Sequence, residues 1–141
     1  MIRKSASANW DGGLKGGSGT ISTQSGVLKD ASYSFATRFE DKVGTNPEEL
    51  VGAAHAACFA MFLSALMEGA DVAGGSVKAK STITLDPSTE GSPTVTAAHL
   101  DVTIMGDAPD ATLKELADTA KAGCPISKLL KAEVTMTVTL G

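Results

Sequence analysis

The sequence has few side chains that could bind a metal ion through sulfur or nitrogen. Its 141 residues include two cysteines, Cys58 and Cys124, and two histidines, His55 and His99. Structural zinc needs about four ligands, and the spacing of these residues matches no compact ligand pair. We therefore expect no metal and no cofactor.

The chain also lacks clusters of one charge and long apolar runs. Twelve basic and sixteen acidic residues give a formal net charge of −4, and no Lys/Arg cluster stands out, which disfavours a nucleic-acid partner. The basic start leads into a polar segment without the apolar core of a signal peptide, and no apolar run looks long and clean enough to span a bilayer. These absences favour a cytoplasmic protein with no membrane contact. Thiols stay reduced there, so a disulfide would more often be transient and catalytic than structural.

What is present is a composition typical of one globular domain. Hydrophobic residues make up 43% of the chain and charged residues 20%, a soluble and not a disordered balance. We expect a single domain over residues 1–141, which is long enough to bury a core.

Glycine turns and alternating residues predict the order strands, helix, strands, helices, strand along the chain. Alternation of period two, or an extended pattern, indicates strands at residues 5–10, 19–23, 32–36, 77–85, 94–104 and 132–140. Residues 37–46 form an expected polar loop. An amphipathic helix is predicted from Asp110 to Ala122, with a short helical turn from Pro125 to Leu130. This order of elements is typical of an α+β fold.

The start of a long apolar helix is well marked. Asn46 is a good N-cap, Pro47 suits the first helical position, and Glu49 falls three residues after the cap. The residues that follow are apolar on nearly every face up to Gly69, so we expect a central helix covered on most sides.

The two cysteines have opposite local settings, and together they could be inert packing, half of a metal site or a redox couple. Cys124 precedes Pro125 and becomes a helix N-cap, where free N–H groups and the helix dipole lower a thiol pKa. Cys58 lies about three turns into the apolar helix, where burial raises a thiol pKa and favours a packed, unreactive side chain. On local sequence, a small cap-filling residue is as good an interpretation of Cys124 as a reactive one.

Cys58 becomes reactive only if a cation reaches it. Arg38 is the best candidate because arginine keeps its charge and offers several donors. Glu48 could orient Arg38, since it lies on roughly the same side of the helix as Cys58, although the two α-carbons would be about 15 Å apart. His55 shares the Cys58 face, but a packing or interface role fits it better, and no glycine-rich oxyanion motif supports a cysteine hydrolase.

Three stretches of the chain resemble the OsmC/Ohr family of organic hydroperoxide reductases. They are Gly44-Thr45-Asn46-Pro47-Glu48-Glu49-Leu50, Ala53-Ala54-His55-Ala56-Ala57-Cys58-Phe59 and Lys121-Ala122-Gly123-Cys124-Pro125-Ile126-Ser127. The resemblance extends over the whole chain, and its motifs are closer to the osmotically inducible OsmC branch than to the Ohr branch.

The resemblance implies a site and a fold. Cys58 would be the peroxidatic cysteine and Cys124 the resolving one, with Arg38 and Glu48 completing the site. The implied fold is an intertwined homodimer with curved antiparallel sheets wrapping two central helices.

The implied activity is a thiol peroxidase that defends against oxidative or osmotic stress. It would reduce organic hydroperoxides to alcohols through a Cys58 sulfenic acid that Cys124 resolves as a disulfide. An apolar wall would favour organic peroxides, with candidate residues Phe39, Phe59, Met61 and Phe62. An external dithiol, for which the family suggests lipoylated proteins, would reduce the disulfide. The alternative is a non-enzymatic stress protein that binds small molecules and has structural thiols.

Overall fold

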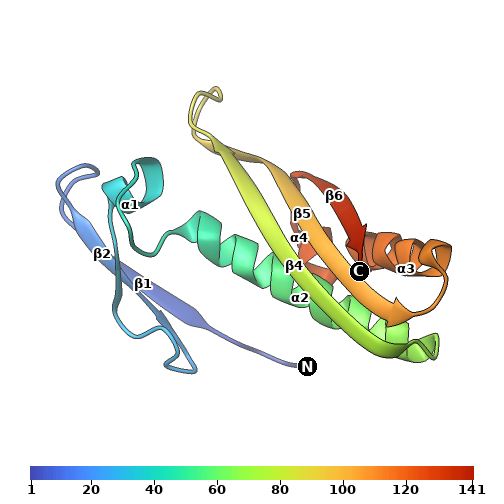
Figure 1. Ribbon diagram of the computed structural model, residues 1–141. Helices are drawn as coiled ribbons and strands as arrows, with labels where there is room; N and C mark the ends of the chain where they lie inside the picture. The colour runs from blue at the N-terminus through green and yellow to red at the C-terminus, as the bar shows by residue number, and fades with distance from the viewer. The chain divides into compact units, whose positions relative to one another are not determined.

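The computed structural model describes residues 1–141, whose elements form two compact units, residues 1–50 and residues 51–141 (Figure 1). The boundary falls in the first turn of the long helix α2. The class is α+β, as predicted from the sequence. In chain order the elements are β1 Ala6–Asp11, β2 Ser18–Thr23, β3 Ala31–Tyr33, α1 Phe35–Phe39, α2 Pro47–Gly69, β4 Ala73–Asp86, β5 Thr94–Asp107, α3 Asp110–Gly123, α4 Pro125–Leu129 and β6 Glu133–Leu140.

The first unit contains an antiparallel sheet of order β1-β2-β3. Gly19 of β2 lies opposite Trp10 of β1 and Tyr33 of β3, whose ring centroids are 5.3 Å apart. A Cβ atom at position 19 would collide with the Tyr33 ring. The missing side chain therefore makes room for the aromatic pair to close over the central strand.

Helix α1 lies where the sequence predicted the end of a strand and the start of a polar loop. The third strand ends at Tyr33, and Ser34 caps the helix in a capping box with Thr37. The Thr37 hydroxyl accepts from the Ser34 N–H at 2.9 Å, and the Ser34 hydroxyl accepts from the Thr37 N–H at 3.3 Å. This reciprocal pair satisfies two free donors and stabilises a helix too short to show periodicity in the sequence.

Helix α2 begins and ends as predicted. The Asn46 side-chain oxygen accepts from the Glu49 N–H at 2.8 Å, Pro47 is the first helical residue and Gly69 the last.

The apolar character of α2 corrects one sequence prediction. By length and composition this helix could cross a membrane, with a mean hydropathy of 1.9, whereas the sequence was expected to contain no such run. Alanine, leucine, methionine and phenylalanine raise the hydropathy of the run, and the core helix of a globular protein passes the same test.

The second unit contains a sheet of order β4-β5-β6, in which β4 and β5 are antiparallel and β6 is parallel to β5. The expectation of antiparallel sheets is wrong for this last pairing. Helices α3 and α4 carry the chain from β5 back toward the end where β5 began, so that β6 runs in the same direction. Strands β4 and β5 also extend beyond their predicted bounds, because they remain paired out to Ala73 and Asp107, past a register shift between Ala73 and Ser76.

The core of the second unit lies between one face of this sheet and the helices, which Figure 1 shows on the same side. Alternate residues of β5 point inward, as expected for a strand with one buried face. The buried cluster comprises Phe59, Leu63, Met67, Leu100, Val102, Ile104, Leu113, Ala117, Ala120 and Cys124. One of the two cysteines is therefore a core residue.

Candidate active site

An ion pair in the first unit joins Arg38 of α1 to Glu48 in the first turn of α2. Arg38 Nε donates to Glu48 Oε1 at 3.0 Å, and Nη2 donates to the same oxygen at 2.9 Å. The Glu48 side chain is 14% exposed, whereas that of Arg38 is 36% exposed. The carboxylate therefore orients a guanidinium that still has a free edge toward solvent.

Aromatic side chains surround this guanidinium. It lies over the Phe39 ring at 5.2 Å from the centroid, which is cation–π distance. A pocket of about 260 Å³ opens beside it, lined by Trp10, Leu14, Tyr33, Ser34, Phe35, Arg38 and Phe39. Phe39 thus belongs to the Arg38 surroundings in the first unit.

The two cysteines meet in the second unit. Cys124 follows α3 and caps α4, and its side chain is fully buried. Cys58, on α2, is half-buried, and the two free thiols lie near each other. The sequence could not prove this contact, because the two residues lie on different helices.

The two neighbouring thiols have opposite pKa shifts. Burial and the hydrogen bond to Cys124 raise the pKa of Cys58. Burial also tends to raise the pKa of Cys124, but the Cys58 hydrogen bond and the N–H groups of Ser127 and Ile126 outweigh it, so the Cys124 pKa is lowered. These N–H groups stabilise the thiolate form of Cys124 and not its neutral form, since the neutral thiol makes no capping hydrogen bond. Both directions agree with the local sequence argument.

Cys58 opens onto an apolar pocket of about 320 Å³, lined by Cys58, Met61, Phe62, Ala65 and Pro125. Met61 is 78% exposed and forms the rim. Phe59 does not line this pocket and is fully buried in the core. Of the expected apolar wall, Met61 and Phe62 therefore lie beside the Cys58 thiol.

The His55 ring is hydrogen-bonded to two serines and not to the Cys58 thiol, whose helix face it shares in the sequence. Its ring is fully buried, with Nδ1 at 2.8 Å from the Ser81 hydroxyl and Nε2 at 2.9 Å from the Ser127 hydroxyl. Sequence reasoning missed both serines. A signal was present for Ser81, a polar residue on the inward-facing register of β4 between Ala79 and Ile83.

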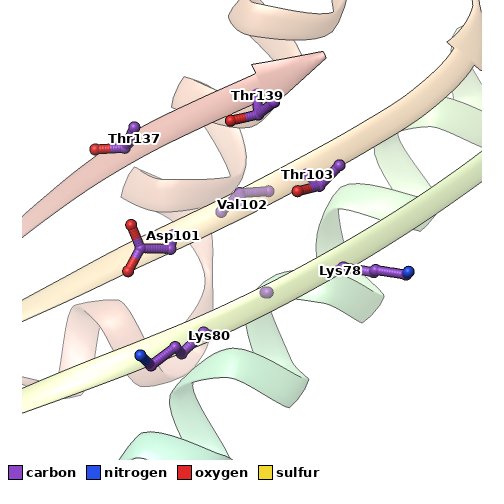
Figure 2. Close-up of a pocket in the computed structure, with 8 residues that line it drawn as sticks. Lys78, Lys80, Asp101, Val102, Thr103, Thr137 and Thr139 are labelled. Carbon is purple, nitrogen blue, oxygen red and sulfur yellow. The ribbon is translucent and has the colours of Figure 1, made fainter. Parts of the chain in front are cut away.

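No group of three or more His, Cys, Asp or Glu side chains is arranged to hold a metal ion. A polar pocket of about 320 Å³ lies on the outer face of the second sheet, and Figure 2 shows lysines of β4 beside an aspartate and threonines of β5 and β6. No cysteine lines this pocket.

Comparison with known proteins decides the family. The family profile described as "OsmC-like protein" matches residues 39–139. Peroxiredoxin OsmC of Escherichia coli K12 is 46% identical over 137 residues, which covers 96% of this chain and 94% of that protein. The chain belongs to the OsmC-like family.

Solved structures of OsmC-like proteins share the fold. An OsmC-like protein of unknown function from Vibrio cholerae superposes with a TM-score of 0.76 at 17% identity, covering 99% of this chain and 100% of that one. The organic hydroperoxide resistance protein OhrB of Bacillus subtilis has a TM-score of 0.67 at 24% identity, covering 97% and 98%. Both confirm the OsmC-like fold expected from the sequence motifs.

Membership of the OsmC-like family also confirms the predicted enzyme class. Identity of 46% to a named peroxiredoxin over nearly the whole chain supports peroxidase activity and a role in hydroperoxide stress. The structure brings Arg38 together with Glu48 in one unit and Cys58 together with Cys124 in the other.

Proposed function

We propose that this protein is a thiol-dependent peroxidase that reduces organic hydroperoxides to alcohols. The observation that carries the proposal is the pair of neighbouring free thiols, one of which lines an apolar pocket. The family assignment supports the same chemistry.

Cys58 is the proposed nucleophile because it is the thiol that lines the pocket, whereas Cys124 is fully buried. The Cys58 thiolate attacks the distal oxygen of ROOH and the O–O bond breaks. The sulfur gains that oxygen as a sulfenic acid, and the leaving alkoxide takes a proton to become the alcohol.

Cys124 resolves this intermediate. Its thiolate attacks the Cys58 sulfur, a disulfide forms, and the hydroxide that leaves takes a proton to become water. An external dithiol then reduces the disulfide and returns both thiols; lipoylated proteins are the proposed source of that dithiol. A lowered pKa suits Cys124 to this second step, since the thiolate is the attacking form.

Cys58 itself needs a cation, because burial and the Cys124 hydrogen bond raise its pKa. We assign this role to Arg38, which would stabilise the Cys58 thiolate and the charge that develops on the leaving oxygen. Glu48 would hold the guanidinium in place, as its ion pair with Arg38 suggests.

The apolar lining of the Cys58 pocket favours an organic group on the substrate. Met61, Phe62, Ala65 and Pro125 offer contact to an alkyl chain and few partners to the small polar hydrogen peroxide. The proposal further includes a single OsmC-like domain over residues 1–141, a homodimer and a cytoplasmic location.

Variants of the two cysteines and of Arg38 test the mechanism in a steady-state assay with an alkyl hydroperoxide and a dithiol. We expect Cys58→Ser to lose activity, Cys124→Ser to lose turnover but keep one reaction with peroxide, and Arg38→Met to slow that reaction at least about 100-fold.

Mass spectrometry after one equivalent of peroxide should show a loss of about 2 Da in the unaltered protein, from an internal disulfide. Activity retained by Cys58→Ser would sink the assignment, and an unchanged mass would favour a binding protein with structural thiols.

A further inference from the structure

One wall of the Cys58 pocket rests against the end of helix α3. Phe62 lines the pocket of about 320 Å³ onto which Cys58 opens. Its side chain is partly buried and packs against the core of the second unit. The ring also lies beside Gly123, the last residue of α3. The position of this ring therefore depends on what stands at position 123.

The absence of a side chain at Gly123 makes room for the Phe62 ring. A Cβ atom at position 123 would lie 2.9 Å from Phe62 Cε1 and 3.3 Å from Cζ. Carbon atoms in contact normally stay about 3.5 to 4.0 Å apart, so one of the two partners would have to move. The backbone at the end of α3 is held by the Cys124 N–H, which donates to the Ala120 carbonyl at 2.9 Å. The ring lies at the far end of a side chain, so the ring would move.

Backbone conformation does not explain the glycine at position 123. A glycine at the end of a helix often adopts the left-handed conformation with a positive φ, which other residues rarely adopt. Gly123 is not among the glycines of this chain that have a positive φ, and Cys124 after it has a φ of −55°. Alanine could adopt the same backbone. What the glycine provides here is space.

We propose that Gly123 sets the width of the Cys58 pocket and so the size of the organic group that the site accepts. The inference rests on the proposed thiol peroxidase and specifies its substrates as hydroperoxides with a bulky, branched or aromatic organic group. With no side chain at position 123, the Phe62 ring lies back against α3. A methyl group there would push the ring away from α3 and into the pocket, because the core occupies its other surroundings. Gly123 acts through Phe62 and is a positioning residue.

The size of the substrate distinguishes this role from a purely structural one. Gly123→Ala should lower the ratio of kcat/KM for cumene hydroperoxide to kcat/KM for hydrogen peroxide about tenfold, since the displaced ring takes space that only the bulky substrate needs. Gly69→Ala is the matched control: it makes the same change in the last residue of α2, where a Cβ would meet nothing within 4 Å. Its ratio should stay unchanged. A loss of stability alone would lower both efficiencies together, and thermal unfolding measures it separately.

A second substitution tests whether Gly123 acts through the ring. The double variant Gly123→Ala/Phe62→Leu lacks the ring atoms that would collide with the new methyl group, so it should recover the ratio that Gly123→Ala loses. The single variants complete a double-mutant cycle, which measures the coupling between the two positions. A ratio that stays low in the double variant would contradict the proposal.

Alkylation of Cys58 measures the width of the pocket without any peroxidase activity. In a Cys124→Ala background, Gly123→Ala should slow the reaction with N-phenylmaleimide relative to that with the smaller iodoacetamide, and Phe62→Leu should speed it. If Gly123→Ala does not fold, Phe62→Leu decides the matter, and an unchanged ratio would refute the role of the ring. Equal ratios in Gly123→Ala and Gly69→Ala in either assay would overturn the inference and leave the peroxidase intact. Absence of peroxidase activity in the unaltered protein would instead refute the proposed function.

Discussion

At the residue scale, the two cysteines divide the properties that a peroxidase needs from its thiols. Cys58 has access to the apolar pocket but a raised pKa, while Cys124 has a lowered pKa and is fully buried. Because Cys58 lines the pocket, it is the thiol that a substrate can reach. Because the pKa of Cys124 is lowered, Cys124 ionises more readily, which suits it to attack the sulfenic acid in the second step. In the proposed mechanism, the Arg38 cation would stabilise the thiolate form of Cys58 when peroxide is present.

The proximity of the two thiols predicts a reciprocal effect on their pKa values. Cys58→Ala removes a donor to the Cys124 thiolate, so the pKa of Cys124 should rise. Cys124→Ala should lower the pKa of Cys58, because the bond that favours its neutral form is lost. Thiolate absorbance against pH measures both. Cys58→Ser keeps a hydroxyl donor and should shift Cys124 less than Cys58→Ala; equal shifts would contradict the hydrogen bond.

The lowered pKa of Cys124 also makes the stability of the fold depend on pH. The pKa of Cys124 is lower in the folded protein than in a free thiol. Its contribution to stability is therefore fully present above the unfolded pKa and is lost as the pH falls through the folded pKa.

At the element scale, the start of α2 depends on Asn46, whose side chain makes two hydrogen bonds. Its oxygen accepts from the Glu49 N–H at 2.8 Å, and its nitrogen donates to the Thr37 carbonyl at 3.2 Å. Asn46 is 9% exposed, so both groups are shielded from water. The cap thus joins the end of the α1 segment to the helix that carries Glu48.

Asn46→Ala should lower the free energy of unfolding by about 1 to 2 kcal/mol, because it removes the cap and leaves the Thr37 carbonyl without this donor. Asn46→Asp keeps the capping oxygen and should cost less. Urea denaturation measures the difference, with Glu49→Gln as a control that retains the capped N–H. An unchanged midpoint for Asn46→Ala would show that the cap contributes nothing to stability.

Local signals explain which elements could be predicted. The α2 bounds follow from a cap, a proline and a closing glycine, all of which act over a few residues. Helix α1 was missed because five residues show no periodicity, although the spacing of Ser34 and Thr37 resembles a capping box. The direction of β6 was missed because it depends on α3 and α4, which carry the chain back to the end of the sheet where β5 began. The residues of β6 themselves contain no signal for this direction.

At the scale of the whole molecule, α2 has apolar residues on a face that the chain leaves uncovered. The opposite face packs into the core through Phe59, Leu63 and Met67. The exposed residues of α2 beyond its first turn are Ala53, Ala54, Ala57, Met61, Ser64, Ala65, Glu68 and Gly69. A face of mostly small apolar residues suits close packing against another helix, which supports the proposed homodimer.

Ala57→Lys should convert the expected dimer to a monomer, since burying an unpaired ammonium in an apolar interface costs several kcal/mol. Sedimentation velocity measures the change. Thr119→Lys adds the same charge on the exposed side of α3 and should leave the assembly unaltered. A monomeric unaltered protein, or a dimeric Ala57→Lys variant, would contradict the homodimer.

The sequence by itself determined the α+β class, most helix and strand positions, the family and the opposite pKa tendencies of the two cysteines. Caps, periodicity and helix-terminus fields act over a few residues, so they can be recognised along the chain. Only the tertiary structure decided that Cys58 and Cys124 lie near each other and that His55 bonds Ser81 and Ser127. These contacts join residues far apart in the chain, and packing α2 and α4 against one sheet brings them together.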